Sequence, residues 1–470
     1  MKTSSSTASI PNPTPFLFLI TAIAVLLWPD AAGMTALAVA GAIAIPLALV
    51  WIAKSPQVAI IAMVAASAIP RLAVDLAGLK ARPEHIVGGM MILAIPFLWK
   101  KREQPVRWIL PDRLLMAYVA LNFFSSIFMS LQPAQTIKWA AQQVLAILPY
   151  FWLRLLITDR TMFRWAFRVL LIAGVIASAY AIVCFYANIF VGSELGVEVA
   201  QYGDVPATYG LQFEANILGA YSGTLSVMML AMYLQERSRK FLIGFSFFGL
   251  LTMAISLSRG ALGATLIAIS FVGFFSLKRG LLNRKVVASI ILASVCAVLL
   301  VVPFVLAHYT ERFSTVELND PTADPNTMTR AVQTFSAVDE ILKHPFFGGG
   351  TASFQLAFNW QDLGTGWEDQ GWIGNTELRV LHDTGVVGLI VFALFVFSLA
   401  RGGWKVLKRQ SSPELVALLA SACVYLISFQ ATEGTLLAFT WIHLGLIGCA
   451  VSVLNSQEEQ EKALAETAST

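Results

Sequence analysis

Four arginines lie at or within one end of an apolar segment of the chain, where an ionic side chain is costly without a partner. They are Arg71, Arg82, Arg259 and Arg379. Arg259 is the clearest case, because it is the only charged residue between Phe241 and Leu277. A guanidinium is planar and always charged, and it binds phosphate groups through two parallel hydrogen bonds. These residues predict a site at which several arginines converge on one anionic ligand.

The composition indicates the environment in which these arginines lie. Hydrophobic residues make up 57% of the 470 residues and charged residues 13%, and the mean hydropathy is +0.71. A soluble domain of this size does not bury so much apolar surface. The sequence therefore predicts an integral membrane protein. The formal net charge of +4 does not by itself indicate nucleic acid or another acidic partner.

Apolar segments long enough to cross a bilayer recur along the chain. Because a spanning helix needs about 20 residues, we expect an all-α polytopic membrane protein with about 14 transmembrane helices, in a range of roughly 12–14. Residues 241–277 predict a helical hairpin with Arg259 near its turn. The expected organisation is an N-terminal group of transmembrane helices over residues 1–308, a periplasmic loop or lid over 309–377, and C-terminal transmembrane helices with a short cytoplasmic tail over 378–470.

The basic residues predict how these helices are oriented. With an even number of spans both termini lie on one side, and 23 of the 32 Lys and Arg fall on that side. Because cytoplasmic loops carry an excess of Lys and Arg, we expect both termini in the cytoplasm. The nine basic residues on the outer side are Arg71, Lys80, Arg82, Lys138, Arg259, Arg312, Arg330, Lys343 and Arg379. The four arginines described above therefore lie at the outer face.

Residues 309–377 form the one sizeable segment that is expected outside the membrane. Within it, residues 327–343 have helical periodicity, and a proline and three glycines at 345–350 end the helix. One face of this helix carries Val332, Phe335, Val338, Ile341 and Leu342. An amphipathic helix of this kind lies on a membrane surface or over a cavity. We expect it to act as a lid.

Several motifs in the chain carry a resemblance to a known family. They are Arg82-Pro83-Glu84, "FEANILGAY", "LSRGALG" at the hairpin turn, Arg330 followed by "HPFFGGGTASF", and "NTELRVLHDTGVVGL". In order and spacing they resemble the O-antigen ligase and polymerase superfamily of bacterial inner-membrane glycosyltransferases. Each motif alone is a weak signal. The resemblance covers residues 205–450 best.

The resemblance implies a substrate and a set of roles. The donor would be a glycan linked to polyprenyl diphosphate, the acceptor a second glycan, and the cavity would open to the periplasm, with no cofactor, metal or nucleotide sugar. The diphosphate would be bound by Arg71, Arg82, Arg259, Arg330 and Arg379. Arginines at the leaving diphosphate would stabilise its growing negative charge. Besides the lipid bilayer, a chain-length regulator or a flippase would be the candidate partners.

The chain departs from the family at the residue expected to be the general base. Ligases of the family carry a histidine directly before the asparagine that aligns with Asn375, whereas this chain has Gly374. A second departure is Glu214, where many relatives carry a proline-asparagine pair. A carboxylate at the mouth of a span is a candidate to deprotonate a sugar hydroxyl. We give Glu214 and a second group equal weight as the base; that group is Glu377, His382 and Asp383.

Some charged residues have simpler interpretations. Asp75 is expected to pair with Arg71 one turn earlier, and Glu84 to orient Arg82. His382 near a helix start is also compatible with a packing or hydrogen-bonding role. The four cysteines fall within apolar spans and have no metal-ligand spacing.

Three functions remain open on the sequence alone. Polymerisation of lipid-linked oligosaccharide repeats of O-antigen or exopolysaccharide is favoured over ligation to lipid A core, because the ligase histidine is absent. A secondary anion transporter is the less favoured alternative, since transporters place broken helices and polar groups near the membrane midplane, whereas the charges here gather at one face.

Overall fold

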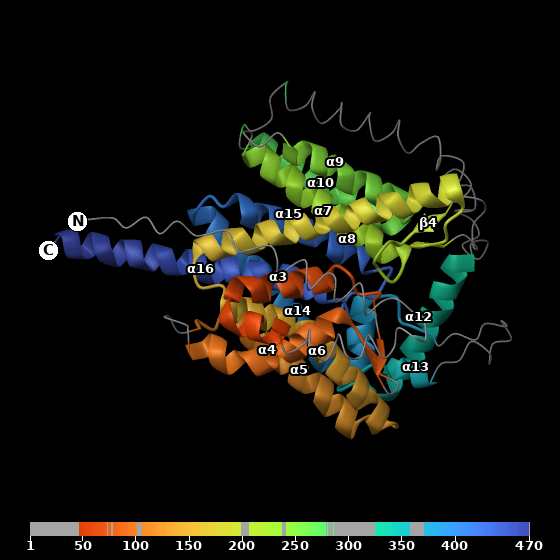
Figure 1. The fold of residues 1–470 in the computed structure, drawn as a ribbon. Coiled ribbons are helices and arrows are strands. Elements are labelled where there is room, and N and C mark those ends of the chain that lie inside the picture. Colours follow the sequence, from red (N-terminus) through yellow and green to blue (C-terminus); the bar gives the residue numbers. More distant parts are fainter. Residues whose placement is uncertain are drawn as a thin grey trace. The chain divides into compact units, whose positions relative to one another are not determined.

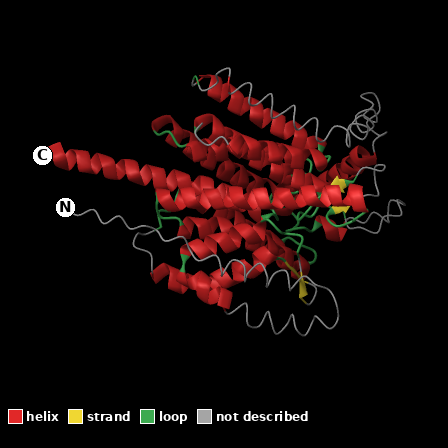
Figure 2. Cartoon of the chain, turned by 45° about the horizontal axis from the view of Figure 1, so that its top comes forward, coloured by secondary structure: helices red, strands yellow, loops and turns green. Residues whose placement is uncertain are grey.

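The computed structural model describes residues 47–72, 74–76, 79–100, 106–198, 206–236, 241–278, 280, 285, 325–357 and 371–469. Helices dominate these residues and the strands are very short (Figure 2). Residues 1–46 and 286–308 of the expected N-terminal group of transmembrane helices lie outside the described residues, as do residues 309–324 and 358–370 of the expected periplasmic loop.

The helices and strands follow one another along the chain as drawn in Figure 1. The helices are α3 Pro56–Ser67, α4 Pro83–Lys100, α5 Leu110–Phe128, α6 Pro133–Leu156, α7 Arg160–Val191, α8 Ala215–Gln235, α9 Phe241–Ile255, α10 Arg259–Lys278, α12 Pro325–Lys343, α13 Phe354–Ala357, α14 Thr376–Arg409, α15 Pro413–Ser428 and α16 Ala438–Ser469. The strands are β1 Val74–Leu76, β2 Leu79–Ala81, β3 Val197–Glu198 and β4 Ala207–Thr208. The chain forms two compact units, of which one contains the described residues 47–59 and 89–100 and the other the remaining described residues.

Five of the described helices are long and apolar enough to cross a membrane: α7, α8, α10, α14 and the first part of α16. The protein is therefore an all-α membrane protein in its general class. The expected total of about 14 spans remains a prediction. The strands differ from a purely helical expectation, because β1 pairs with β2 and β3 with β4 as two antiparallel hairpins. The division at residues 308 and 377 also remains a prediction.

The hairpin predicted at 241–277 is confirmed, with α9 and α10 joined by the turn at 256–258. Both helices pack against α8, which is buried along its whole length. The close approach requires a glycine, because a Cβ on Gly219 of α8 would lie 2.7 Å from Ser256 Oγ and 2.9 Å from Ser258 Cβ. Ser258 Oγ in turn accepts a hydrogen bond from Ala261 N and so caps α10. These contacts fix where α10 begins.

Helix α14 is broken near its start, and the break is bound to the glycine-rich loop that follows α12. Gly385 has φ +67°, a left-handed conformation that favours glycine. The loop supplies the missing backbone partners: Gly349 N donates to His382 O over 2.9 Å and Gly350 N to Asp383 O over 3.2 Å. A Cβ on Gly385 would lie 2.2 Å from the Phe346 carbonyl carbon. The loop therefore positions the first two turns of α14.

The helix predicted at 327–343 is confirmed as α12, and it runs across the direction of α7 and α8 (Figure 1). Its predicted apolar face is wrong in part. Ile341 packs inward with Ala337, whereas Phe335 and Leu342 are 72% and 70% exposed. Ala337 and Ile341 share a helix face with Arg330, which lies seven residues before Ala337. This face packs against the protein, whereas the face with Phe335 and Leu342 does not. The role of this helix as a lid remains a prediction.

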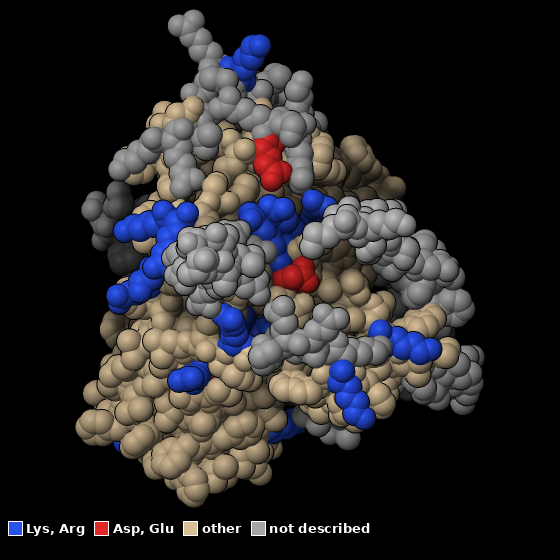
Figure 3. All heavy atoms as spheres, turned by 90° about the vertical axis from the view of Figure 1, so that its left-hand side faces the viewer, with Lys and Arg blue, Asp and Glu red and all other residues tan. Residues whose placement is uncertain are grey.

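Basic residues gather at the end of the helices where α7 begins and α16 ends, and they clearly outnumber acidic ones there (Figure 3). Two contacts join the helix termini at this end: Arg164 of α7 pairs with Glu414 of α15 over 3.1 Å, and Gln410 after α14 donates to Leu454 O of α16 over 2.9 Å. Exposed Lys405 and Lys408 lie in the last turns of α14. This is the distribution that the positive-inside rule associates with a cytoplasmic face.

Candidate functional site

The candidate site is built around one short loop, residues 430–437, which joins α15 to α16. Its sequence, "QATEGTLL", places polar side chains and free backbone carbonyls between two apolar helices. In the structure the loop contacts residues from several distant parts of the chain. It is referred to below as the 430–437 loop.

Ala431 is the first point of convergence. Its carbonyl oxygen accepts a hydrogen bond from Arg330 Nη1 of α12. A Cβ on Gly260, the second residue of α10, would lie 3.8 Å from Ala431 Cβ, and one on Gly374 would lie 3.8 Å from the carbonyl oxygen. The start of α10, α12 and the start of α14 therefore meet at this residue.

Arg379 is buried beside Glu433 of the loop. Only 3% of its side chain is exposed, and its Nη1 lies 3.1 Å from Glu433 Oε2. Its Nε donates to Asp383 Oδ2 over 3.4 Å, one helical turn further along α14. The guanidinium lies 5.3 Å from the ring centre of Trp372. Within the described residues, Nη1 makes no contact with an acceptor beyond the ion pair with Glu433, and Nη2 makes no hydrogen bond. Because buried donors are normally paired, Nη2 is available to a ligand.

Arg82 reaches the same loop from the other side. Its Nη1 donates to Leu436 O over 2.9 Å, and the guanidinium lies 4.3 Å above the ring of Phe213. Glu84 Oε1 lies 3.8 Å from Nη1, as expected from the sequence. Burial lowers the pKa of Arg82, and the carboxylates of Glu84 and Glu433 oppose this shift. Arg82 therefore lies close enough to Glu433 to feel its charge.

Arg71 is linked to this group through Phe213. Its Nη1 donates to Phe213 O over 3.2 Å, and its guanidinium lies 3.7 Å above the ring of Tyr209. Unlike Arg379, its side chain is exposed. The predicted pairing with Asp75 concerns a side chain outside the described part of the structure. Arg71 thus lies at the edge of the site.

Glu214 directly precedes α8 and faces Thr432. The Thr432 hydroxyl donates a hydrogen bond to Glu214 Oε1. Burial raises the pKa of Glu214, whereas the Thr432 hydroxyl and the charge of Arg330 oppose the rise. Glu198 and Glu433 add to it as nearby negative charges. A carboxyl with a raised pKa beside arginines is a reasonable proton acceptor.

The second group of base candidates does not lie together, because among the described residues Glu377 contacts the 430–437 loop and His382 does not. Both oxygens of Glu377 accept from Gln430 Nε2 over 2.7 Å, so its carboxylate is tied to the 430–437 loop. His382 Nδ1 lies 3.1 Å from Asp383 Oδ1, and its ring meets that of Phe354 edge-on at 5.6 Å. His382 lines a cavity of about 100 Å³ together with Glu340 of α12, residues 129–132 between α5 and α6, and residues between 344 and 356. Within the described part of the chain, its link to the arginines runs through Asp383.

Arg259 is the first residue of α10 and is partly buried. Its neighbour Gly260 lies against Ala431, so the backbone at Arg259 is next to the 430–437 loop. The structure thus places five of the predicted residues in direct contact with this loop: Arg82, Arg330, Arg379, Glu214 and Glu377. The backbone of Arg259 lies beside it, Arg71 is linked to Arg82 through Phe213, and His382 is linked to Arg379 through Asp383. Their chemical roles remain predictions.

Glu433 and Thr432 are the residues that sequence reasoning missed. The apolar stretches 414–430 and 433–454 leave a connection of only two residues, 431 and 432, so the sequence does not predict a site loop there. The available signal was a carboxylate at the mouth of a span, the same argument that selected Glu214. Among the described residues, no group of three or more His, Cys, Asp and Glu side chains is arranged to hold a metal.

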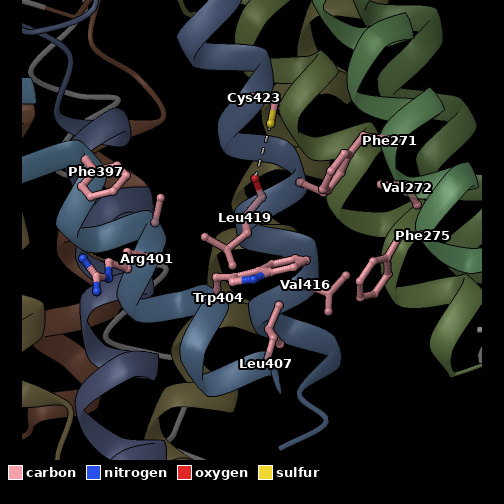
Figure 4. Close-up of a pocket in the computed structure, with 12 residues that line it drawn as sticks. Phe271, Val272, Phe275, Phe397, Arg401, Trp404, Leu407, Val416, Leu419 and Cys423 are labelled. Atoms are coloured by element: carbon pink, nitrogen blue, oxygen red, sulfur yellow. Dashed lines mark hydrogen bonds between the residues drawn. The ribbon is translucent and has the colours of Figure 1, made fainter. Parts of the chain in front are cut away.

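A larger pocket lies far along α14 from this site. It has a volume of about 400 Å³ and is lined by α10, α14 and α15. Phe271 and Phe275 of α10 face Trp404 of α14 across it, and the Arg401 guanidinium points away from them (Figure 4). Its lining is almost entirely apolar, so it has the character of a lipid-facing groove rather than a site for chemistry.

Comparison with known proteins supports the resemblance that the motifs carry. Residues 243–393 match the family model described as O-antigen ligase. This range contains Arg259, Arg330 and Arg379, whereas Arg82 and the 430–437 loop lie outside it. No curated protein sequence matches the chain. The match supports the resemblance to the O-antigen ligase and polymerase superfamily over residues 243–393, which are less than half of the chain.

Proposed function

We propose that the protein is a glycosyltransferase of the bacterial inner membrane that polymerises O-antigen or exopolysaccharide repeats carried on a polyprenyl diphosphate such as undecaprenyl diphosphate. It acts at the periplasmic face, with both termini in the cytoplasm. The observation that carries the proposal is the convergence of Arg82, Arg330 and Arg379 on one loop, from three segments far apart in the sequence.

The arginines act on the diphosphate. As the bond between the anomeric carbon and the diphosphate oxygen breaks, negative charge grows on the leaving group. Arg379 offers Nη2, a buried nitrogen with no hydrogen-bond partner among the described residues, and Arg82 is held nearby through Leu436 O. Donors fixed in advance in a poorly solvated site stabilise such charge strongly. No metal is needed in this scheme.

Glu214 is the general base of the proposed reaction. Its carboxylate lies near Arg330, whose charge acts on it, and it accepts one hydrogen bond from Thr432. Burial raises its pKa, which makes it a better proton acceptor than an ordinary glutamate. Glu377 is held by Gln430, which leaves it less free to approach a sugar hydroxyl.

Ligation to a different acceptor, such as lipid A core, is the second candidate function. The observation that favours it is the buried pair of His382 and Asp383, 3.1 Å apart, because a histidine held by a carboxylate is a common base. A transporter gains less support. Helix α14 is broken at Gly385, yet the break lies near the start of the 34-residue helix and beside the arginines, not at its middle.

Purified protein tests the proposal directly. Incubated with a synthetic polyprenyl-diphosphate oligosaccharide and no nucleotide sugar or added metal, the wild type should yield a ladder of longer lipid-linked glycans. Arg379→Lys should abolish most of this activity, because lysine keeps the charge but not the planar, two-nitrogen geometry. Arg164→Lys is the matched control, since Arg164 pairs with Glu414 away from the site. A product formed only with lipid A core would favour ligation, and full activity of Arg379→Lys would contradict the proposed diphosphate site.

A further inference from the structure

Arg379 is already paired with carboxylates in the structure. Its partners are Asp383, one turn along the same helix, and Glu433, from the 430–437 loop. Both carboxylates are largely buried, with 3% and 13% of their side chains exposed. An anionic ligand that approaches Arg379 therefore meets two negative charges at the guanidinium it must bind.

The positive charges of Arg82 and Arg379 are opposed by several nearby carboxylates. Among the described residues, Arg82 and Arg379 lie close to three carboxylates, those of Glu84, Asp383 and Glu433. The surroundings are therefore not the strongly positive site that the arginines alone would make. In a poorly solvated place, each added negative charge weakens the binding of a diphosphate.

Glu433 differs from the other two carboxylates in its position. Asp383 also contacts His382, and Glu84 follows Arg82 closely in sequence. Glu433 comes from a separate loop and its two oxygens are used differently. Oε1 accepts from Thr435 N over 2.5 Å and also from the Thr435 hydroxyl, whereas Oε2 faces Arg379. Three residues further, Leu436 N also donates to Glu433 Oε1 over 3.3 Å, and Leu436 O accepts from Arg82. Glu433 therefore pairs with Arg379 and also lies close enough to Arg82 for its charge to act on it.

We propose that Glu433 is an internal anion that competes with the diphosphate of the lipid-linked donor for Arg379 and so limits how tightly the product diphosphate is held. The inference rests on the proposed function. After transfer, the product is the polyprenyl diphosphate itself, which carries more negative charge than the donor and would be bound most tightly by unopposed arginines. A carboxylate that returns to Arg379 favours release of this product.

The test is to remove the charge of Glu433 while keeping its shape. Glu433→Gln retains an oxygen for the Thr435 backbone amide but no longer opposes an anion. Binding of farnesyl diphosphate in detergent should become at least about tenfold tighter, with slower steady-state turnover and unchanged rate in a single turnover. Glu340→Gln is the control. It removes a partly exposed carboxylate that pairs with Lys343, and it should leave the affinity for farnesyl diphosphate unchanged.

A second variant covers the case in which Glu433→Gln does not fold. Thr435→Val removes the hydroxyl that holds Oε1 and keeps every charge, so it should loosen Glu433 and tighten farnesyl diphosphate binding by a smaller factor. Unchanged or weaker binding in the folded variants would overturn the role of Glu433. The proposed function fails in a different way: neither wild type nor variant would bind farnesyl diphosphate or extend a glycan.

Discussion

Two buried arginines of this protein differ in how completely their hydrogen bonds are made. Arg154 donates to Asp112 through Nε over 3.1 Å and Nη2 over 3.0 Å, and to Arg107 O over 2.7 Å. Asp112 also accepts from Tyr150 over 2.7 Å. By contrast, Arg379 Nη1 faces only Glu433 Oε2, and its buried Nη2 makes no hydrogen bond among the described residues. Unmade bonds in a buried group are costly, which favours the proposed ligand-binding role for Arg379 and a structural role for Arg154.

Substitution of the two base candidates separates polymerase from ligase chemistry. Glu214→Gln should bind lipid-linked donor normally and elongate it at least ~100-fold more slowly, since a positioned base contributes about that much. Glu214 must be ionised to accept a proton, and its pKa is raised by burial. Wild-type activity should therefore fall on the acidic side at a higher pH than for an ordinary glutamate, measured as kcat against pH.

His382→Ala is the companion variant in the same assay. This variant should still transfer glycan, and its kcat should fall at low pH in the same way as that of the wild type. The reverse result, an active Glu214→Gln and an inactive His382→Ala, would assign the base to the His382 and Asp383 pair and favour the ligase. Activity in both variants would mean that the arginines act without a general base.

At the scale of elements, the break in α14 depends on one glycine. Gly385→Ala would require φ near +67° in alanine and would bring a Cβ to 2.2 Å from the Phe346 carbonyl carbon. We expect a loss of about 2 kcal/mol or more in stability, seen as a lower melting temperature in detergent. Gly263→Ala is the control, because a Cβ there meets no atom within 4 Å. An unshifted melting temperature for Gly385→Ala would contradict a rigid link between the loop and α14.

Some of the helices and turns could be predicted from the sequence, and others could not. The hairpin of α9 and α10 and the end of α12 followed from apolar length and from the proline and glycines after Lys343. The inward face of α12 did not, because Ala337 is only weakly hydrophobic and its burial depends on Phe354 and Ile373 from other segments. The break in α14 was also missed. Gly385 lies inside a long apolar pattern, and only the docking of the 345–350 loop makes its conformation favourable.

For the whole molecule, thiol labelling tests the proposed orientation in the membrane. In a cysteine-free background of intact cells, Lys405→Cys should react only with membrane-permeant thiol reagents, because α14 ends on the basic face. Glu340→Cys in α12 should react with impermeant reagents as well. Both side chains have accessible surface. Impermeant labelling of Lys405→Cys alone would invert the proposed topology and remove the periplasmic location of the site.

How the site comes together could be predicted only in part at this scale. The arginines were found because each is a charge at the end of an apolar segment. Their common partner was not, since the sequence gives no distance between residues such as Arg82 and Leu436, which are 354 positions apart. Pairings of this kind depend on how the helices pack, and one sequence carries no direct signal for that packing.

The place of the 430–437 loop in the chain has a consequence for biogenesis. Synthesis and membrane insertion proceed from the N-terminus, so Arg82, Arg330 and Arg379 are all made before their common partner exists. The proposed site is completed only when α15 and α16 have been inserted. A nascent or truncated chain that ends after the matched residues 243–393 would contain most of the arginines and yet lack the loop that holds them together.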